Sequence, residues 1–305
     1  MAKNLKETGT RVKLDGADMF IRGFTYVFIS IFALCCLFPC VLIVMSSFAT
    51  EDSIRRSGFT FWPTEFTTYS YELIFKAPDM MVGSYIVTIL MTLTGTAVGL
   101  FVIAMTGYAL QRKDFPYRNK ISFYIFFTSL FNAGMVPFYL MMVQVYNLRD
   151  SYLAVWLPLL MSPWLIILMK NFIKAIPHEI TESGKIDGAG DFRIFITLIL
   201  PTITPALATI GLFIALGYWN EWYNSSLFLT SSIRYKPLQY YLYSIVNKVA
   251  SLKNSVAGAM LATESLPAET LKMATAVVAT GPIILLYPFV QKYFVAGLTV
   301  GSVKG

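Results

Sequence analysis

The chemically capable side chains of this chain gather in two segments. One reads IPHEITESGKIDGAGDFRIFITLILP from Ile176 to Pro201, and the other reads WNEWYN from Trp219 to Asn224. The first holds the single histidine, His178, for which we expect a solvated loop position because no second ligand or catalytic partner stands near it. It also holds the sole Gly-Lys pair, at Gly184, which lacks the earlier glycine of a phosphate-binding loop. We therefore expect no catalytic residue, bound metal or cofactor in this chain.

The segment from Ile176 to Pro201 predicts two short helices joined by a turn. A first helix should run from about Pro177 to Ile186, because proline suits the first helical position and glutamates suit the early turns. Asp187-Gly188 should break it, since glycine supplies backbone freedom. The apolar residues that recur at helical spacing after the break are Phe192, Phe195, Ile196 and Ile199. The generic interpretation is an amphipathic loop at a membrane interface.

The segment from Trp219 to Asn224 combines aromatic faces with amide and carboxylate groups. Sugars have apolar ring faces edged by hydroxyls, so this mixture suits a sugar site. The segment also interrupts an apolar stretch, which points to a substrate path in transporters. The candidates are Trp219, Asn220, Glu221, Trp222 and Tyr223, together with Asn132 in another apolar stretch. An aromatic anchor at a helix end, and helix packing through the Asn132 amide, explain the same residues.

The composition indicates a membrane protein. Of 305 residues, 56% are hydrophobic and only 13% are charged, against roughly 25% charged in a soluble domain. The mean hydropathy is +0.62. The net charge of +7 comes from short basic clusters between apolar runs, which are typical of topology signals rather than of a nucleic-acid surface.

Six apolar stretches approach the length of about 20 residues that a bilayer requires. They run approximately over residues 24–48, 84–110, 121–146, 152–169, 205–222 and 273–294. The first is too long for the apolar region of a signal peptide and has no cleavage motif after it, so we expect a retained span. Its three cysteines, Cys35, Cys36 and Cys40, are expected to be small packing residues.

Basic residues predict the orientation, because cytoplasmic loops carry an excess of lysine and arginine. The amino-terminal tail and the segment after the second span are both rich in them; the residues are Lys3, Lys6, Arg11, Lys13, Arg22, Arg112, Lys113, Arg118 and Lys120. Both termini and residues 170–204 should therefore face the cytoplasm. Residues 223–272 should form a long external loop, whose tyrosines suit either an interfacial belt or a docking surface; they are Tyr235, Tyr240, Tyr241 and Tyr243.

The predicted spans lack the side chains of an ion-driven carrier. Such carriers keep ionisable groups at mid-membrane, where a charge costs about 2.5 to 3.5 kcal/mol. The centres of these spans hold none, and Glu221 lies near an outer end. If the protein moves a solute uphill, we expect another subunit to hydrolyse the nucleotide. An ion-driven secondary transporter and a membrane scaffold are the alternatives.

The segment after Ile176 resembles the cytoplasmic loop of binding-protein-dependent ABC importer permeases. The signature of that loop is E-A-A, three residues, G, nine residues, I, one residue, L-P. Here it reads Glu182-Ser183-Gly184, then Gly188, then Leu198 and Leu200-Pro201, with every spacing kept. The tail from Phe294 to Gly305 is similar to that of maltose-type sugar permeases. The runs DGAG with FRIF, and FNAG before Pro137, are most similar to the branch for complex oligosaccharides.

The resemblance implies an all-α type I permease fold with six spans and a cytoplasmic coupling helix. It implies import of an oligosaccharide delivered by an extracellular solute-binding protein, with another nutrient as the alternative. The implied partners are a second, homologous permease in a heterodimer, two ATPase subunits that bind ATP and Mg, and the lipid bilayer of a bacterial cell membrane; no nucleic acid is implied. The coupling residues would be Glu182, Ser183, Gly184, Asp187 and Gly188.

The expected layout follows from the spans and the resemblance together. Residues 1–22 form a cytoplasmic tail, residues 23–296 the permease domain, and residues 297–305 a second cytoplasmic tail. The coupling loop covers residues 175–203 and the external loop residues 223–272. Glu182 is expected to contact a basic ATPase side chain, or to stabilise the start of its own helix. A side chain at Gly188 would strain a positive backbone angle or separate the docked surfaces.

Overall fold

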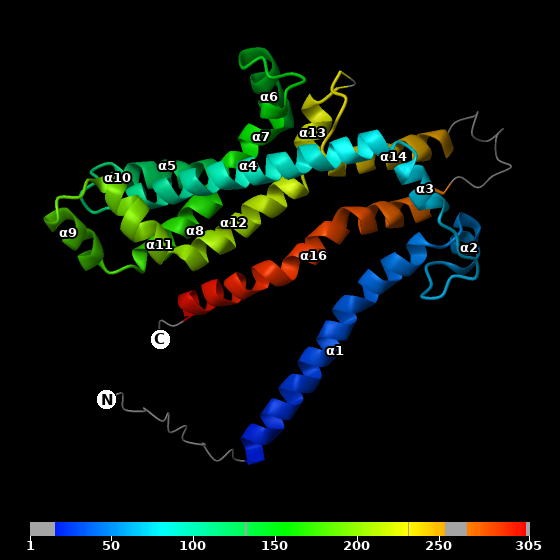
Figure 1. Cartoon of the computed structure of the whole chain (residues 1–305), viewed down its shortest axis with the longest axis horizontal. Coiled ribbons are helices and arrows are strands. Elements are labelled where there is room, and N and C mark those ends of the chain that lie inside the picture. Colours follow the sequence, from blue (N-terminus) through cyan, green and yellow to red (C-terminus); the bar gives the residue numbers. More distant parts are fainter. Residues whose placement is uncertain (1–15, 132, 231, 254–266, 303–305) are drawn as a thin grey trace, which may run out of the picture.

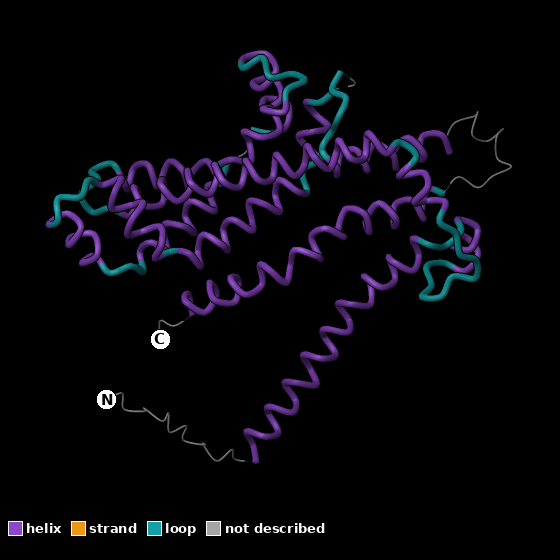
Figure 2. Tube along the Cα trace, in the orientation of Figure 1, coloured by secondary structure: helices purple, strands orange, loops and turns teal. Residues whose placement is uncertain are grey.

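The computed structural model describes residues 16–302 except 132, 231 and 254–266, and its named elements are all helices. They are α1 (Gly16–Ser47), α2 (Glu51–Ser57), α3 (Tyr69–Phe75), α4 (Pro78–Gln111), α5 (Arg118–Leu130), α6 (Met135–Leu140), the π-helix η1 (Met141–Val145), α7 (Tyr152–Leu160), α8 (Pro163–Lys174), α9 (His178–Ile186), α10 (Asp191–Ile194), the π-helix η2 (Phe195–Ile199), α11 (Leu200–Thr202), α12 (Thr204–Trp219), α13 (Tyr223–Phe228), α14 (Leu238–Lys253) and α16 (Ala268–Ser302). The predicted all-α fold is confirmed (Figures 1 and 2).

The described helices provide between four and six membrane spans. Four spans are continuous or nearly so: residues 19–47, 78–111, 152–174 and 268–285 are long and apolar enough to cross a bilayer. Two bent pairs of helices bring the number to six if each pair is counted as one span. α5 meets α6 and η1 at 115°, and the helical run from Asp191 to Thr202 meets that from Thr204 to Phe228 at 86°. The six expected spans correspond to these four helices and two bent pairs.

Helix α1 stands apart from the other spans over most of its length (Figure 1). None of the most apolar window of its span is buried within the chain. It begins at Gly16, so the last residues of the expected tail 1–22 are helical. Cys35, Cys36 and Cys40 are exposed on it. The described residues of this chain do not cover them, so their expected role as small packing residues stays a prediction.

Helices α4, α8 and α12 form the main core, which contains the buried side chains of Ile103, Met169 and Tyr218. Glycines on α4 allow this close approach, as small residues do between membrane helices. A Cβ at Gly95 would lie 2.2 Å from the Tyr218 ring, and one at Gly99 would lie 2.9 Å from the main-chain oxygen of Leu160. The Tyr218 hydroxyl donates to the carbonyl of Trp156 at 2.8 Å. These contacts hold α4, α7 and α12 together.

The two ends of the bundle differ in construction. α9 lies at one end together with the carboxyl-terminal end of α16, and α2 and α3 lie at the other (Figure 1). At the second end, the buried Glu51 carboxylate accepts the main-chain N–H groups of Glu269 at 2.9 Å and of Thr270 at 3.3 Å. It thereby caps the first turn of α16. Ser70 on α3 donates to the Thr270 hydroxyl at 2.9 Å.

The four tyrosines of the expected external loop have different surroundings. Tyr235 packs over Gly83, where a Cβ would lie 2.1 Å from its ring. Tyr240 lies under the ammonium of Lys236, 4.9 Å from the ring centroid. Tyr241 packs against the buried cluster that joins α3, α14 and α16, and Tyr243 lies against Trp222.

Candidate functional site

The segment from Ile176 to Pro201 folds as the predicted hairpin. α9 runs from His178 to Ile186 with Pro177 as its N-cap, within one residue of the expected helix. Gly188 has φ +74°, which confirms the break and the need for glycine there. Main-chain hydrogen bonds close the turn: Gly188 donates to Lys185 and Ala189 donates to Gly184, both at 3.0 Å. We call residues 178–202, from α9 through α11, the hairpin.

The second arm of the hairpin buries only part of the predicted apolar set. Phe195 and Ile199 are buried in the main core, whereas Phe192 is 62% exposed. Ile196 is 36% exposed. The arm contains the π-helix η2 rather than a continuous α-helix. This change of helical period explains why the faces deviate from the spacing of an ideal α-helix.

Gly184 sets the distance between the two arms. A Cβ there would lie 3.0 Å from Ile194 Cγ1 and 3.0 Å from Leu198 Cδ1. Gly184 is the only buried residue of α9. The first arm therefore packs closely against the second at a glycine.

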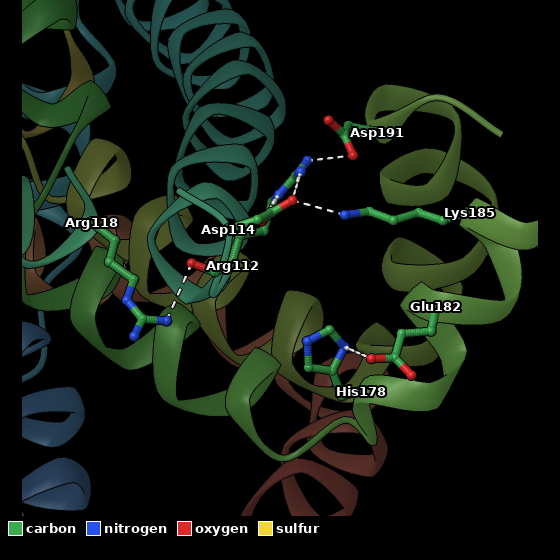
Figure 3. A network of polar contacts seen from close by, with 7 residues as sticks. All are labelled: Arg112, Asp114, Arg118, His178, Glu182, Lys185 and Asp191. Carbon is green, nitrogen blue, oxygen red and sulfur yellow. Dashed lines mark hydrogen bonds and ion pairs between the residues drawn. The ribbon is translucent and has the colours of Figure 1, made fainter. Parts of the chain in front are cut away.

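Four charged residues tie the hairpin to the end of α4 (Figure 3). The Arg112 guanidinium donates to Asp114 through Nε at 2.8 Å and through Nη2 as well, and its Nη1 lies 2.5 Å from Asp191. Lys185 Nζ donates to the same Asp114 carboxylate at 2.8 Å. The Arg112 side chain is only 19% exposed. We call Arg112, Asp114, Lys185 and Asp191 the ion-pair network; it joins α4 to both arms of the hairpin.

Arg112 and Asp114 stabilise each other in their charged forms. Hydrogen bonds from Arg112 and then from Lys185 hold the pKa of the Asp114 carboxyl well below its usual range. The same bond to Asp114 raises the pKa of Arg112. Because the folded-state pKa of Asp114 is lowered, its contribution to stability is fully present above the ordinary pKa and is lost only as the pH falls through the lowered value.

The other predicted coupling residues, on α9 and directly after it, are exposed. The Glu182 side chain is 64% exposed and lies 3.8 Å from Nδ1 of His178. The loop position expected for His178 is wrong: it is the first residue of α9, placed one turn before Glu182. Ser183 and Asp187 are exposed. Ile186 is 86% exposed at the tip, and the sequence interpretation treated it only as a helix end.

A cavity of about 590 Å³ lies behind α9, between it and the ends of α4 and α8. Its lining includes Arg112, Lys113, Lys174 and Glu182. The ion-pair network thus holds the hairpin near its turn, and the main chain connects its two ends to α8 and α12. The cavity separates the first arm from the ends of α4 and α8. Such a construction can transmit a push as one rigid piece while leaving its outer face accessible.

The structure divides the second set of candidates. Trp219 is buried and donates its indole N–H to the carbonyl of Ala279 on α16 at 3.1 Å. The Glu221 carboxylate is buried and accepts the N–H of Asn224 at 2.6 Å, so it caps α13. Asn220, Trp222 and Tyr223 are exposed. Asn132 lies outside the described residues.

The exposed members of this set have partners that the sequence interpretation missed. The Trp222 ring lies 4.8 Å from that of Tyr243, centroid to centroid. Gln239 donates to the Asn220 amide oxygen at 3.2 Å. Both partners come from α14, and the sequence offered no signal that this helix folds back onto the end of α12. Arg112 was missed as a site residue because its charge was interpreted only as a topology signal, and Asp114 was not singled out at all.

Comparison with known families and structures gives a consistent result. The family model described as "Binding-protein-dependent transport system inner membrane component" matches residues 109–300. A crystal structure of a bacterial ABC transporter involved in the import of the acidic polysaccharide alginate contains a similar chain, with a TM-score of 0.74 and 32% identity. The similarity covers 92% of this chain and 98% of that one.

Curated relatives are similar along nearly their whole length. The polygalacturonan/rhamnogalacturonan transport system permease protein YtcP of Bacillus subtilis (strain 168) is 39% identical, over 94% of this chain and 98% of that protein. The arabinooligosaccharides transport system permease protein AraQ of Halalkalibacterium halodurans is 27% identical, over 93% of this chain and 95% of that protein. The expectation of a transport subunit rather than an enzyme is confirmed by these relatives.

Proposed function

Because this chain belongs to the family of binding-protein-dependent transport system inner membrane components, we propose that it carries acidic oligosaccharides and is driven through the hairpin. It is a permease subunit of an ABC importer, works with an ATPase and a solute-binding protein, and lies in the membrane. Its cargo, the number and kind of its partner subunits and the roles of single residues are the parts that we propose.

An acidic cargo is supported by the relatives of higher identity. YtcP, at 39% identity, is a polygalacturonan/rhamnogalacturonan permease, and the transporter at 32% imports alginate. Galacturonan and alginate units both carry a carboxylate. Relatives at 27% and 26% identity transport arabinooligosaccharides and maltodextrin, which are neutral. A neutral oligosaccharide is therefore the second candidate for the cargo.

The proposed drive passes through the exposed face of the hairpin. Glu182, Ser183, Ile186 and Asp187 would meet a cleft of the ATPase, with Glu182 contacting a basic side chain there. Motion of the ATPase would then move the hairpin and the helices joined to it as one body. The observation that carries this proposal is the ion-pair network, because it fixes the hairpin to α4 while the face of α9 remains exposed.

The proposed assembly contains a second, homologous permease and two ATPase subunits, which bind ATP and Mg. A second permease would have room to pack against α1, because most of that helix is exposed within the described part of this chain. The hairpin faces the cytoplasm in this assembly, and so do both termini. The carboxyl-terminal end of α16 at the hairpin end of the bundle supports the placement of that terminus (Figure 1).

The test of the drive compares two glycines of the same turn. Gly188 has φ +74°, whereas Gly190 has φ −67° in extended backbone, and a Cβ at either one meets nothing within 4 Å of this chain. Gly188→Val would strain the turn by about 1–3 kcal/mol, and Gly190→Val would not. In proteoliposomes of the complete transporter, we expect Gly188→Val to abolish uptake and substrate-stimulated ATP hydrolysis, while Gly190→Val keeps both.

The same proteoliposomes test the energy source. Uptake should depend on ATP and should persist in the presence of an ionophore, whereas an ion-driven carrier would lose it. Co-purification of the ATPase with each variant separates loss of coupling from loss of assembly. If Gly188→Val keeps wild-type uptake and wild-type stimulated hydrolysis, the hairpin is not the driven element.

A further inference from the structure

A pocket of about 300 Å³ lies between the outer end of α12, α14 and the first turns of α16. Its lining includes Trp222, Gln239, Tyr243 and Lys272, which bring two aromatic rings, an amide and an ammonium to one place. These residues come from three separate elements. α14 and the first turns of α16, which line the pocket, lie toward the end opposite the hairpin (Figure 1). That end is the side where a delivered solute would enter.

The two rings provide a surface for a sugar. Trp222 and Tyr243 are 41% and 43% exposed, and their planes are inclined at 38° with centroids 4.8 Å apart. Partly exposed aromatic faces of this kind suit the apolar face of a pyranose ring. Gln239 is held beside them by its hydrogen bond to Asn220, so its amide is positioned to meet hydroxyls at the edge of the ring.

Lys272 gives the pocket a positive charge. Its ammonium lies 2.8 Å from the Glu269 carboxylate, but the two side chains are 46% and 39% exposed. Exposed pairs of this kind are weak, so a ligand carboxylate can take the place of Glu269. In the sequence, residues 223–272 hold five basic residues against two acidic ones. That balance is unusual for an external segment, since lysine and arginine ordinarily concentrate in cytoplasmic loops.

We propose that this pocket is a subsite for one uronate unit of the passing cargo. The sugar ring stacks on Trp222 and Tyr243, the hydroxyls meet the Gln239 amide, and the carboxylate pairs with Lys272. This inference rests on the proposed acidic cargo and adds to it the residues that select the charge. A neutral oligosaccharide would use the rings but leave Lys272 with Glu269.

The test uses trigalacturonate and the complete transporter in proteoliposomes, with internal ATP and saturating binding protein. Lys272→Gln should lower the maximal uptake rate by about tenfold, the loss expected for one charge-assisted contact. Lys272→Arg should restore most of it. Lys248→Gln is the matched control, because Lys248 is an exposed lysine of α14 outside the pocket lining, and it should keep the wild-type rate.

A second readout separates a subsite from a docking surface for the binding protein. A subsite lowers the maximal rate, whereas a docking contact raises the concentration of loaded binding protein needed for half-maximal uptake. Tyr243→Ala should also lower the maximal rate, and Tyr243→Phe should restore most of it, because phenylalanine retains the aromatic ring. The subsite is excluded if Lys272→Gln matches wild type, or if only the half-saturating concentration changes. If wild type imports no trigalacturonate at all, the proposed cargo fails together with the subsite.

Discussion

At the scale of single residues, Arg112 is the centre of the link between the spans and the hairpin. It contacts one carboxylate from its own loop and one from the second arm, and its side chain is mostly shielded from water. Exposed ion pairs contribute little to stability, but a guanidinium that is shielded from water and bonded to two carboxylates contributes more. Removing it would leave Asp114 and Asp191 close together without their shared cation.

We predict that Arg112→Gln lowers the sugar imported per ATP hydrolysed by about fivefold, as expected for a loss near 1 kcal/mol. The hairpin would still fold, since its turn and the Gly184 contacts do not depend on Arg112. The measurement is uptake and hydrolysis in the same proteoliposomes. Lys113→Gln, at an exposed neighbour in the loop, should leave the ratio unchanged.

A double-mutant cycle identifies the partner of Arg112. Because residues of one network do not act additively, Arg112→Gln combined with Asp191→Asn should be no worse than Arg112→Gln alone. If the two effects add, the pair does not act as a unit and the network does not link α4 to the hairpin.

The turn residues were predictable from the sequence, and the network was not. Gly188 needs a positive φ, and the pattern Asp187-Gly188 after a helix indicates this locally. Arg112 and Asp191 are 79 positions apart in the sequence, and nothing local indicates that the end of α4 reaches α10. Likewise, the aromatic cluster at Trp222 was visible, but Lys272 joined it only through the packing of α14 against α16.

At the scale of elements, α4 is the helix on which the others pack, and its glycines set the distances. Gly95 accommodates the Tyr218 ring, and Gly99 lies against the main chain of α7. A ring can tilt to make room, but a main-chain carbonyl inside a packed bundle cannot move freely. Gly99 is therefore the position where an added methyl group costs most.

We predict that Gly99→Ala lowers the stability of the purified complex by about 1–3 kcal/mol, the usual cost of overpacking. The measurement is the midpoint of thermal unfolding in detergent. Gly217→Ala on α12 is the matched control, because a Cβ there meets nothing within 4 Å; it should be neutral or stabilise by roughly 0.5–1 kcal/mol. Equal shifts for both variants would contradict close packing at Gly99.

Sequence patterns are sufficient to predict some of the helix boundaries but not all of them. The long spans and the extent of α9 follow from hydropathy and from the proline and glycine positions. Hydropathy does not reveal the π-helix η2 or the 86° bend after Thr202, which lie where the second arm joins the main core through Phe195 and Ile199. Hydropathy reports that a segment is apolar, and it is silent about a change of direction within it.

At the scale of the whole molecule, α1 is a long helix that the described part of this chain covers only at its last turns. Its apolar side chains are exposed along most of its length, and only its last turns approach the rest of the chain. In a bilayer this exposure costs little, because lipid tails are as apolar as the side chains. A second permease that packs against α1 would therefore gain from fitting shape rather than from hiding apolar surface.

We predict that Cys35, Cys36 and Cys40 report this contact. In the complete transporter, those facing the second permease should react with a maleimide several-fold more slowly than in this chain purified alone in detergent. Rates in denatured protein give the intrinsic reactivity of each thiol. Identical rates in the chain alone and in the complex would mean that the second permease does not cover this part of α1.

The 86° bend between the second arm of the hairpin and α12 makes this part of the chain an elbow. α12 has 16 residues, and at 1.5 Å per residue the helix is about 24 Å long. A turn of about 5° at Ile203 would therefore sweep the Trp222 end sideways by about 2 Å, farther than a hydrogen bond can stretch. A small rotation of the hairpin at the ATPase end would then be enough to break the contacts with a sugar at the Trp222 end.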